Sequence, residues 1–259
     1  MQASIIFMNQ GKYVFSQVMY FINHNDFPAC VNRYNGDYKV KNRNWKIYED
    51  LGMLLIAEAK KLYADNSGLE VNLTNNVFAI DATTIDLCLS LMPWAKFRQT
   101  KGAVKLHTML YLKTAIPYLV HITTGKTHEL TALDIMTFEP DSFYVMDRGY
   151  IDFPRLYKIH LCKSFFITRT RARLKFTRHQ SFSCNKTLGV KCDQSVKPTL
   201  FYAAKNYAEK MRRIKYFDVA ANKELVLLTN NFDLKATEIA QLYKHRWKIE
   251  LFFKGSNTI

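Results

Sequence analysis

Glycine and proline are scarce in this sequence, with 9 glycines and 6 prolines among 259 residues. That scarcity excludes a collagen-like, linker-rich or disordered chain, because such chains need these residues in large numbers. Hydrophobic residues make up 48% of the sequence and charged residues 23%, which is ordinary for a globular protein. The length allows one large domain, or one domain with a sizeable insertion.

Cysteine is also rare, and the five cysteines are widely spaced with no Cys-x-x-Cys pair. This pattern argues against a disulfide framework and fits free thiols in a reducing compartment. The spacing of His179, Cys184 and Cys192 is poor for a zinc motif. No basic stretch followed by an apolar core opens the sequence, and apolar runs such as Met53–Ala57 are too short to cross a bilayer. We therefore expect a cytoplasmic protein without a membrane partner.

Negative charge is under-represented, because 37 Lys and Arg residues face 22 Asp and Glu residues. The formal net charge is +15. Such an excess is typical of proteins that bind nucleic acids, whose phosphates attract Lys and Arg. A generally basic protein without a nucleic acid partner is the alternative on charge alone.

Hydrophobic periodicity divides the sequence near residue 76. Residues 1–76 have apolar residues at helical spacing, most clearly in Trp45–Leu62. From residue 77 onward short β-rich runs alternate with helical patterns, so we predict an α/β fold: a mixed sheet flanked by helices. The predicted strands are Val77–Leu91, Val104–Ala115, Pro117–Thr124, Phe143–Met146, Phe165–Thr168 and 224–230, and the predicted helices are Leu130–Phe138, Phe153–Cys162 and one that begins after Asp233 as its cap.

The stretch 169–222 has a different pattern. Four cations recur at every second residue, which on one strand would place them on one face: Arg169, Arg171, Arg173 and Lys175. A second basic cluster follows, formed by Lys210, Arg212, Arg213 and Lys215. One interpretation is an edge strand protected by charge. We favour the other, in which these cations contact DNA phosphates.

Three carboxylates indicate a catalytic function. Asp81 and Asp147 each follow an apolar strand-like run, where catalytic groups gather in open α/β sheets. Glu250 lies far downstream on a predicted helix, on the same side as Tyr243 and Arg246. Carboxylates brought together bind hard divalent cations such as Mg²⁺ or Mn²⁺. Two such ions can activate a water and hold both oxygens of a phosphoryl displacement.

The motifs around these carboxylates resemble the DDE transposases of the insertion-sequence-4 type. They are Asp81-Ala82-Thr83-Thr84-Ile85, Met146-Asp147-Arg148-Gly149-Tyr150 and Tyr243-x-x-Arg246-x-x-x-Glu250. The third is similar to the Tyr-Arg-Glu-Lys signature of that family. The three blocks occur in the family's order, and the resemblance covers most of residues 77–254.

The resemblance implies a ribonuclease-H-like catalytic domain over residues 77–259, with a mainly β insertion at about 169–222 before the last catalytic helix. Residues 1–76 would be a helical, shortened DNA-binding segment. The implied activity is cut-and-paste transposition: Asp81, Asp147 and Glu250 carry the metal ions, while Tyr243 and Arg246 contact DNA phosphate near the cleaved end. We add Arg148 as a further candidate DNA contact. The implied partners are double-stranded DNA, as terminal inverted repeats and target, and a second copy of the chain. The implied location is the bacterial nucleoid.

The sequence departs from the family pattern at the signature's lysine. That lysine is expected seven residues after Glu250, where Asn257 stands, and the sequence ends at Ile259. We therefore keep a second interpretation: a catalytically impaired, DNA-binding remnant of a transposase.

Overall fold

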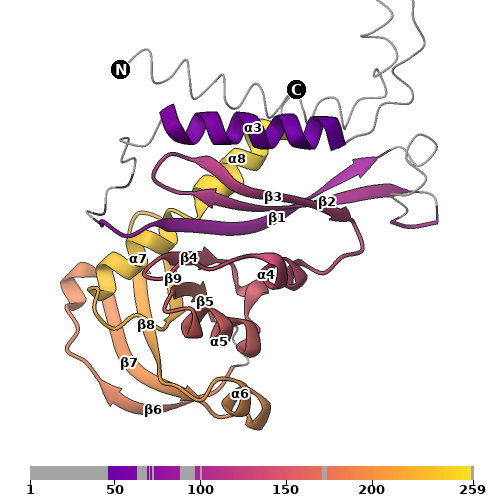
Figure 1. The fold of residues 1–259 in the computed structure, drawn as a ribbon. Helices are drawn as coiled ribbons and strands as arrows, with labels where there is room; N and C mark the ends of the chain where they lie inside the picture. The colour runs from indigo at the N-terminus through magenta and orange to yellow at the C-terminus, as the bar shows by residue number, and fades with distance from the viewer. Residues whose placement is uncertain are drawn as a thin grey trace, which may run out of the picture.

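A nine-stranded mixed sheet forms the centre of the protein. The computed structural model describes residues 46–62, 69, 71, 73–87, 97–99, 101–170 and 174–257. Within these residues the strand order is β3-β2-β1-β4-β5-β9-β8-β7-β6 (Figure 1). The strands are β1 (Val77–Leu87), β2 (Gly102–Tyr111), β3 (Ile116–Thr124), β4 (Phe143–Met146), β5 (Phe165–Arg169), β6 (Phe176–Ser181), β7 (Val190–Pro198), β8 (Met211–Asp218) and β9 (Lys223–Thr229).

Helices cover both faces of this sheet. They are α3 (Lys46–Leu62), α4 (Ala132–Ile135), α5 (Phe153–Leu161), α6 (Phe201–Asn206), α7 (Ala236–Lys244) and α8 (Trp247–Asn257), with short 3₁₀ turns η3 (Glu129–Thr131), η4 (Arg148–Tyr150) and η5 (Lys186–Leu188). Helix α3 packs against β3, and α8 packs against β1. No helix in the described ranges combines the length and apolar character that crossing a membrane requires.

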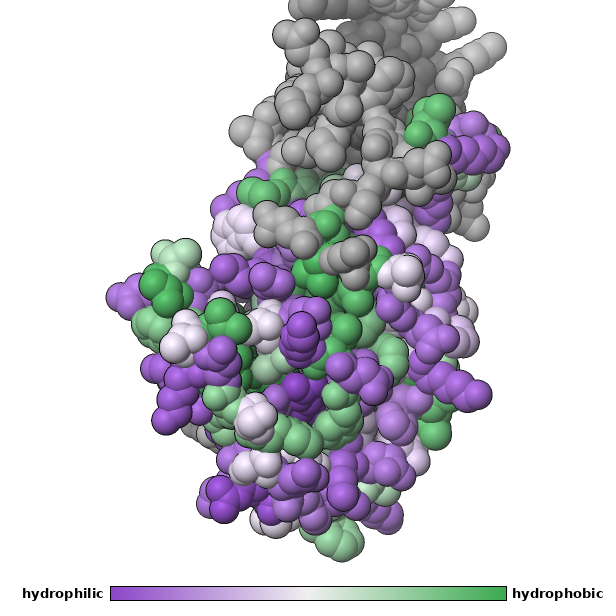
Figure 2. All heavy atoms as spheres, turned by 90° about the vertical axis from the view of Figure 1, so that its left-hand side faces the viewer, coloured by the Kyte–Doolittle hydropathy of each residue, from purple (hydrophilic) through white to green (hydrophobic). Residues whose placement is uncertain are grey.

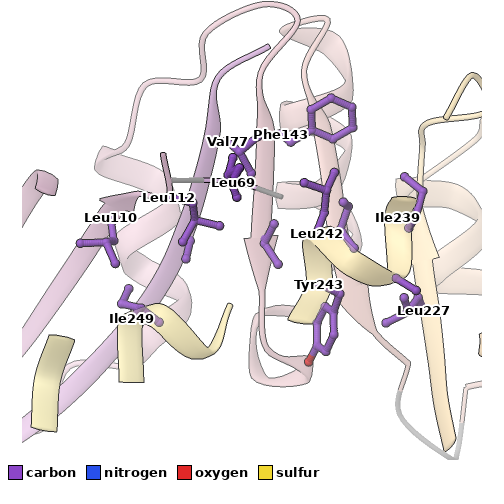
Figure 3. Close-up of a cluster of buried hydrophobic side chains, with 14 of the residues drawn as sticks. Leu69, Val77, Leu110, Leu112, Phe143, Leu227, Ile239, Leu242, Tyr243 and Ile249 are labelled. Atoms are coloured by element: carbon purple, nitrogen blue, oxygen red, sulfur yellow. The ribbon is translucent and has the colours of Figure 1, made fainter. Parts of the chain in front are cut away.

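The alternation of side chains along the strands explains the two cores. On β1, Val77 and Ala79 belong to one hydrophobic cluster, whereas Phe78 and Ile80 belong to the other. The first cluster packs under α7 and α8; Figure 3 shows Ile249 of α8 beside Leu110 and Leu112. The second cluster packs under α4 and α5. A strand buried on both faces reads as a nearly continuous apolar run, as residues 77–80 do.

Most of the predicted elements are confirmed within the described residues. The strands over Phe143–Met146 and Phe165–Thr168 and the helix over Phe153–Cys162 lie within a residue of the observed bounds. The helix after Asp233 differs in two ways. Its N-cap is Lys235, whose backbone N–H donates to Glu238 Oε2 at 2.8 Å. The chain then forms two helices, α7 and α8, where one was predicted.

The prediction of a single strand carrying four cations is wrong for the part that is described. Strand β5 ends at Arg169 and β6 begins at Phe176, while Lys175 lies in neither. Arg171 and Arg173 lie outside the described residues. The strands β6, β7 and β8 do extend the sheet beyond β9. The domain boundaries at 76 and at about 169–222 stay predictions.

The prediction that Arg212 contacts a DNA phosphate also needs correction, because its side chain is buried inside the protein. It points into the protein and is 6% exposed. Its Nε and Nη2 donate to both carboxylate oxygens of Asp193 at 2.9 and 2.7 Å, and its Nη1 donates to the Leu234 carbonyl at 2.6 Å. The Arg212 guanidinium therefore joins β7, β8 and the residues before α7 through charged hydrogen bonds, and these bonds occupy the donors that a phosphate would need.

We expect Arg212→Ala to lower the free energy of unfolding by about 3–5 kcal/mol, because it leaves Asp193 buried and unpaired. Arg213→Ala is the matched control. Arg213 lies next to Arg212 on β8, is half-buried, and makes only a 3.4 Å hydrogen bond to Gln194. It should cost about 1 kcal/mol or less. Urea unfolding of both variants measures the difference, and equal losses would contradict the structural role of Arg212.

Candidate active site

The parallel pairing of β1 and β4 brings the two aspartates together. Ile80 is the register partner of Met146, so the residues that follow, Asp81 and Asp147, come side by side. Each aspartate comes two residues after a residue of the core under α7 and α8, Ala79 for Asp81 and Val145 for Asp147. Because residues two positions apart on a strand share a face, both aspartates lie on the sheet face that α7 and α8 cover. The predicted neighbourhood of the two aspartates is thus found in the structure.

The break between α7 and α8 positions the third carboxylate. The backbone N–H of Arg246 donates to the Tyr243 carbonyl, and that of Ile249 donates to the Arg246 carbonyl, which tightens the chain into a turn. Ile249 is fully buried and fixes α8 on β1. Glu250 follows it and is half-buried. Tyr243, Arg246 and Glu250 therefore face the aspartates even though no single helix carries them.

Arg246 lies between the carboxylates. Its Nη1 is 3.3 Å from Asp81 Oδ2, and its Nη2 donates a short hydrogen bond to Glu250 Oε1. Burial alone would lower the pKa of Arg246, but the Glu250 hydrogen bond and the charge of Asp81 raise the net value. The guanidinium thus stays charged and neutralises both carboxylates.

Asp81 is held in an unfavourable electrostatic environment. Its Oδ1 accepts a hydrogen bond from the Ala82 N–H at 2.9 Å, and its side chain is only 20% exposed. Burial raises its pKa to about 6, and the nearby charges of Asp147 and Glu129 push in the same direction. A carboxyl whose charge is disfavoured by burial and by like charges is typical of a functional site.

Glu129 and Tyr150 are two residues of this region that the sequence interpretation did not single out as site residues. A Cβ on Gly149 would lie 3.6 Å from Glu129 Oε2, and Lys105 Nζ is 3.8 Å from Glu129 Oε1. Tyr150 is buried, and its hydroxyl has no hydrogen-bond partner among the described residues. The only sequence signal for Tyr150 was its place in the Asp147 motif; Glu129 gave none.

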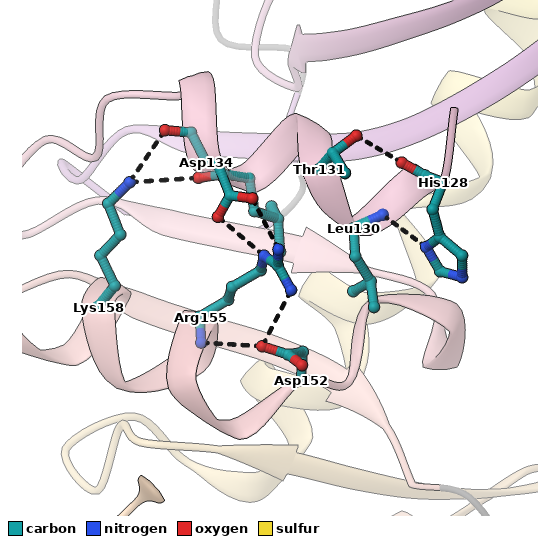
Figure 4. A network of polar contacts seen from close by, with 8 residues as sticks. His128, Leu130, Thr131, Asp134, Asp152, Arg155 and Lys158 are labelled. Carbon is teal, nitrogen blue, oxygen red and sulfur yellow. Dashed lines mark hydrogen bonds and ion pairs between the residues drawn. The ribbon is translucent and has the colours of Figure 1, made fainter. Parts of the chain in front are cut away.

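A polar network fixes the segment that carries Glu129 (Figure 4). Arg155 of α5 binds both oxygens of Asp134, with Nε–Oδ1 at 2.9 Å and Nη2–Oδ2 at 2.7 Å. It also pairs with Asp152, which caps α5. His128 Nδ1 accepts a hydrogen bond from the Leu130 N–H and caps η3. The η3–α4 segment is thereby tied to α5, beside η4.

The other residues predicted to contact DNA differ in how far they are exposed. Tyr243 is 6% exposed; burial raises its pKa, and the charges of Arg246, Asp147 and Arg169 act on it. Arg148 is exposed directly after Asp147. Lys175 and Lys210 are exposed, and Arg169 and Arg213 are half-buried. Hydrophilic and hydrophobic residues interleave on the face shown in Figure 2.

The carboxylates supply the hard oxygen donors that Mg²⁺ and Mn²⁺ prefer. Among the described residues, however, no three His, Cys, Asp or Glu side chains are grouped closely enough to hold a metal ion. Arg246 is bonded to both Asp81 and Glu250. By donor type alone, the three carboxylates fit a divalent cation. His179, Cys184 and Cys192 likewise form no metal group.

Comparison with known proteins identifies the family. Residues 73–256, more than half of the chain, match the family described as Transposase DDE domain. The chain belongs to the DDE transposase domain family. Residues 10–48 separately match a domain of unknown function (DUF4372).

Two curated relatives of this DDE transposase domain are transposases by name. One is "Probable transposase for insertion sequence element IS5377" of Geobacillus stearothermophilus, 27% identical over 176 residues; these are 68% of this chain and 46% of the relative. The other is "Putative transposase y4zB" of Sinorhizobium fredii, 28% identical over 179 residues, or 68% and 49% of the two chains. The chain thus spans about half the length of these relatives.

Replacement of Asp81 by asparagine should stabilise the metal-free DDE domain at neutral pH. The folded pKa of about 6 exceeds the ordinary value of 3.8, so above pH 6 the folded state carries a charge that is disfavoured relative to the unfolded state. Asp81→Asn should raise the free energy of unfolding by up to about 3 kcal/mol at pH 7.5. The gain should shrink as pH falls through 6 and vanish below about 3.8, where both states are protonated.

Urea unfolding at pH 7.5 and pH 4.5, with a chelator present, measures this effect. Asp86→Asn is the control, because Asp86 lies on the same strand with an exposed side chain. A gain in Asp81→Asn that does not depend on pH would contradict the electrostatic explanation.

Proposed function

We propose that this chain is the catalytic part of an insertion-sequence transposase that cleaves DNA and joins strands. The observation that carries the proposal is the placement of Asp81 and Asp147 at adjacent positions of paired parallel strands, with Glu250 linked to Asp81 through Arg246. Membership of the DDE transposase domain family and the names of the two relatives support it.

In the proposed mechanism, Asp81, Asp147 and Glu250 would hold two Mg²⁺ or Mn²⁺ ions through their carboxylate oxygens. Ions in such sites activate a water for hydrolysis and stabilise the charge of the phosphoryl transition state. The fold sets the positions of the carboxylates. The pairing of β1 with β4 positions the two aspartates, and the buried side chain of Ile249 positions Glu250. Tyr243 and Arg246 orient the phosphate next to the cleaved bond.

We assign β1–β5 with α7 and α8 to a ribonuclease-H-like core, and β6–β8 with α6 to the β-rich insertion. The strand order β3-β2-β1-β4-β5, antiparallel over the first three strands and parallel from β1 to β5, supports this division. The proposed partners are double-stranded DNA and a second copy of the chain, bound on paired element ends at the nucleoid.

The cleavage chemistry predicts that Asp81→Ala and Asp147→Ala each lower the rate of metal-dependent DNA nicking about a thousandfold, because the cations supply several kcal/mol of transition-state stabilisation. The substrate is a duplex that carries terminal inverted repeats, to be identified in the DNA on either side of the coding sequence. Asp86→Ala, with its exposed side chain, should cleave like the parent.

Three outcomes of this assay are informative. Parent-like nicking by either aspartate variant would overturn the assignment of the site. DNA binding without nicking by the parent protein would favour the catalytically impaired remnant. Nicking without joined target products would limit the function to a nuclease.

The basic residues predict a second measurement. We propose that Arg148, Arg169, Lys175, Lys210 and Arg213, with Arg171 and Arg173, contact DNA phosphates, whereas Arg212 does not. The logarithm of the DNA-binding constant falls linearly with the logarithm of salt concentration. Lys175→Ala and Lys210→Ala should each make this negative slope shallower by about 1. Lys191→Ala, which removes an exposed lysine paired with Glu224, is the control and should leave the slope unchanged. Fluorescence anisotropy of a labelled duplex measures these slopes, and equal slopes in all variants would contradict the proposed contacts.

A further inference from the structure

Arg246 makes contacts that compete with cations for the carboxylates of Asp81 and Glu250. One guanidinium nitrogen lies 3.3 Å from Asp81 Oδ2, and another donates to Glu250 Oε1. These are carboxylate oxygens of the kind that Mg²⁺ and Mn²⁺ take as ligands. A lone pair that accepts a charged hydrogen bond is not available to a metal ion at the same time.

The surroundings of Arg246 hold it in this position. Its side chain is only 15% exposed, its guanidinium carbon is 5.9 Å from the centre of the Tyr243 ring, and its backbone lies in the tight turn between α7 and α8. Ile249 and Tyr243, both buried, fix the chain on either side of the turn. The contact is therefore part of the packed fold and not a chance encounter of mobile surface charges.

The charge balance explains why the contact forms. Asp81 is desolvated and lies near Asp147 and Glu129, so a cation beside it relieves like-charge repulsion. The planar guanidinium has two donor-bearing ends and can pair with two carboxylates at once, which a lysine ammonium cannot do with the same geometry. Arg246 thus supplies in the metal-free protein the positive charge that the carboxylates require.

We propose that Arg246 closes the carboxylate site in the DNA-free protein, and that divalent cations must displace its guanidinium from Asp81 and Glu250 before they bind. This inference rests on the proposed function, because it takes the same carboxylates as the cation ligands. Its consequence is that Arg246 lowers metal affinity until a phosphate of bound DNA offers the guanidinium another partner. The site is then open to cations when substrate is present.

The test is Mn²⁺ binding to the whole chain without DNA, measured by isothermal titration calorimetry and by the loss of the free Mn²⁺ resonance signal. Arg246→Gln should bind Mn²⁺ at least about tenfold more tightly than the parent, because no hydrogen bond to a charged group has to be broken. Arg246→Lys keeps the charge but loses the two-ended bridge, so it should also bind more tightly, by a smaller factor. Lys244→Gln is the control. Lys244 lies two residues before Arg246 and pairs with Asp218, so its loss removes one nearby positive charge and should leave Mn²⁺ affinity as in the parent.

The outcomes separate this inference from the proposed function. Asp81→Asn should lose Mn²⁺ binding; if it binds like the parent, both the proposed site and the role of Arg246 are overturned. If Asp81→Asn loses binding but Arg246→Gln binds Mn²⁺ no more tightly than the parent, only the inference fails. It also fails if Arg246→Lys binds like the parent, since charge alone would then explain the glutamine variant. Thermal unfolding followed by circular dichroism confirms that each variant is folded.

Discussion

The parallel pairing of β1 with β4 is the constraint on which the site depends. Val77 to Ile80 align with Phe143 to Met146, and the two residues that follow are the aspartates. Because side chains alternate across a strand, a slip of one residue in this register would turn one aspartate to the opposite face. The register is held by the burial of the paired segments on both faces: Val77, Ala79 and Val145 pack under α7 and α8, and Ile80 and Met146 pack against the other core. Core packing on two faces is thus what aligns two like charges.

The strands β1–β5 and β9 and the helix α5 were predictable because their patterns are local. Phe143–Met146 is apolar throughout and is bounded by polar residues, so its burial on both faces is readable from the sequence. Arg212 was not predictable in the same way. Its neighbours in sequence are basic, which indicated a phosphate contact, but its actual partners are Asp193, on the adjacent strand, and the carbonyl of Leu234. A buried ion pair depends on which strands are neighbours, and that information is not in the local pattern.

The sequence named candidate site residues but not their arrangement. Motif order indicated Asp81, Asp147 and Glu250 through the family resemblance, and the two aspartates follow the last pair of the β1–β4 register. The turn at Arg246 was missed because residues 236–257 read as one helical stretch with Ile239, Leu242 and Ile249 as its apolar stripe. All three are indeed buried, in two helices joined by a tightened turn. Glu129 was missed because it reaches the site from the end of β3, through a segment fixed by Arg155 and Asp134.

Arg246 connects the electrostatics of the site to the overall charge of the protein. A half-buried cluster of carboxylates inside a chain of net charge +15 lies in a field that favours anions, yet its members repel one another at short range. A nearby cation reduces the repulsion between these carboxylates. Arg246 supplies that cation, because it is bonded to both Asp81 and Glu250. The DNA substrate that we propose would change this balance, because its phosphates would compete for the guanidinium while its charge would lower the cost of bringing in metal cations. Under that proposal, the residue that neutralises the carboxylates is also the one that the substrate would release.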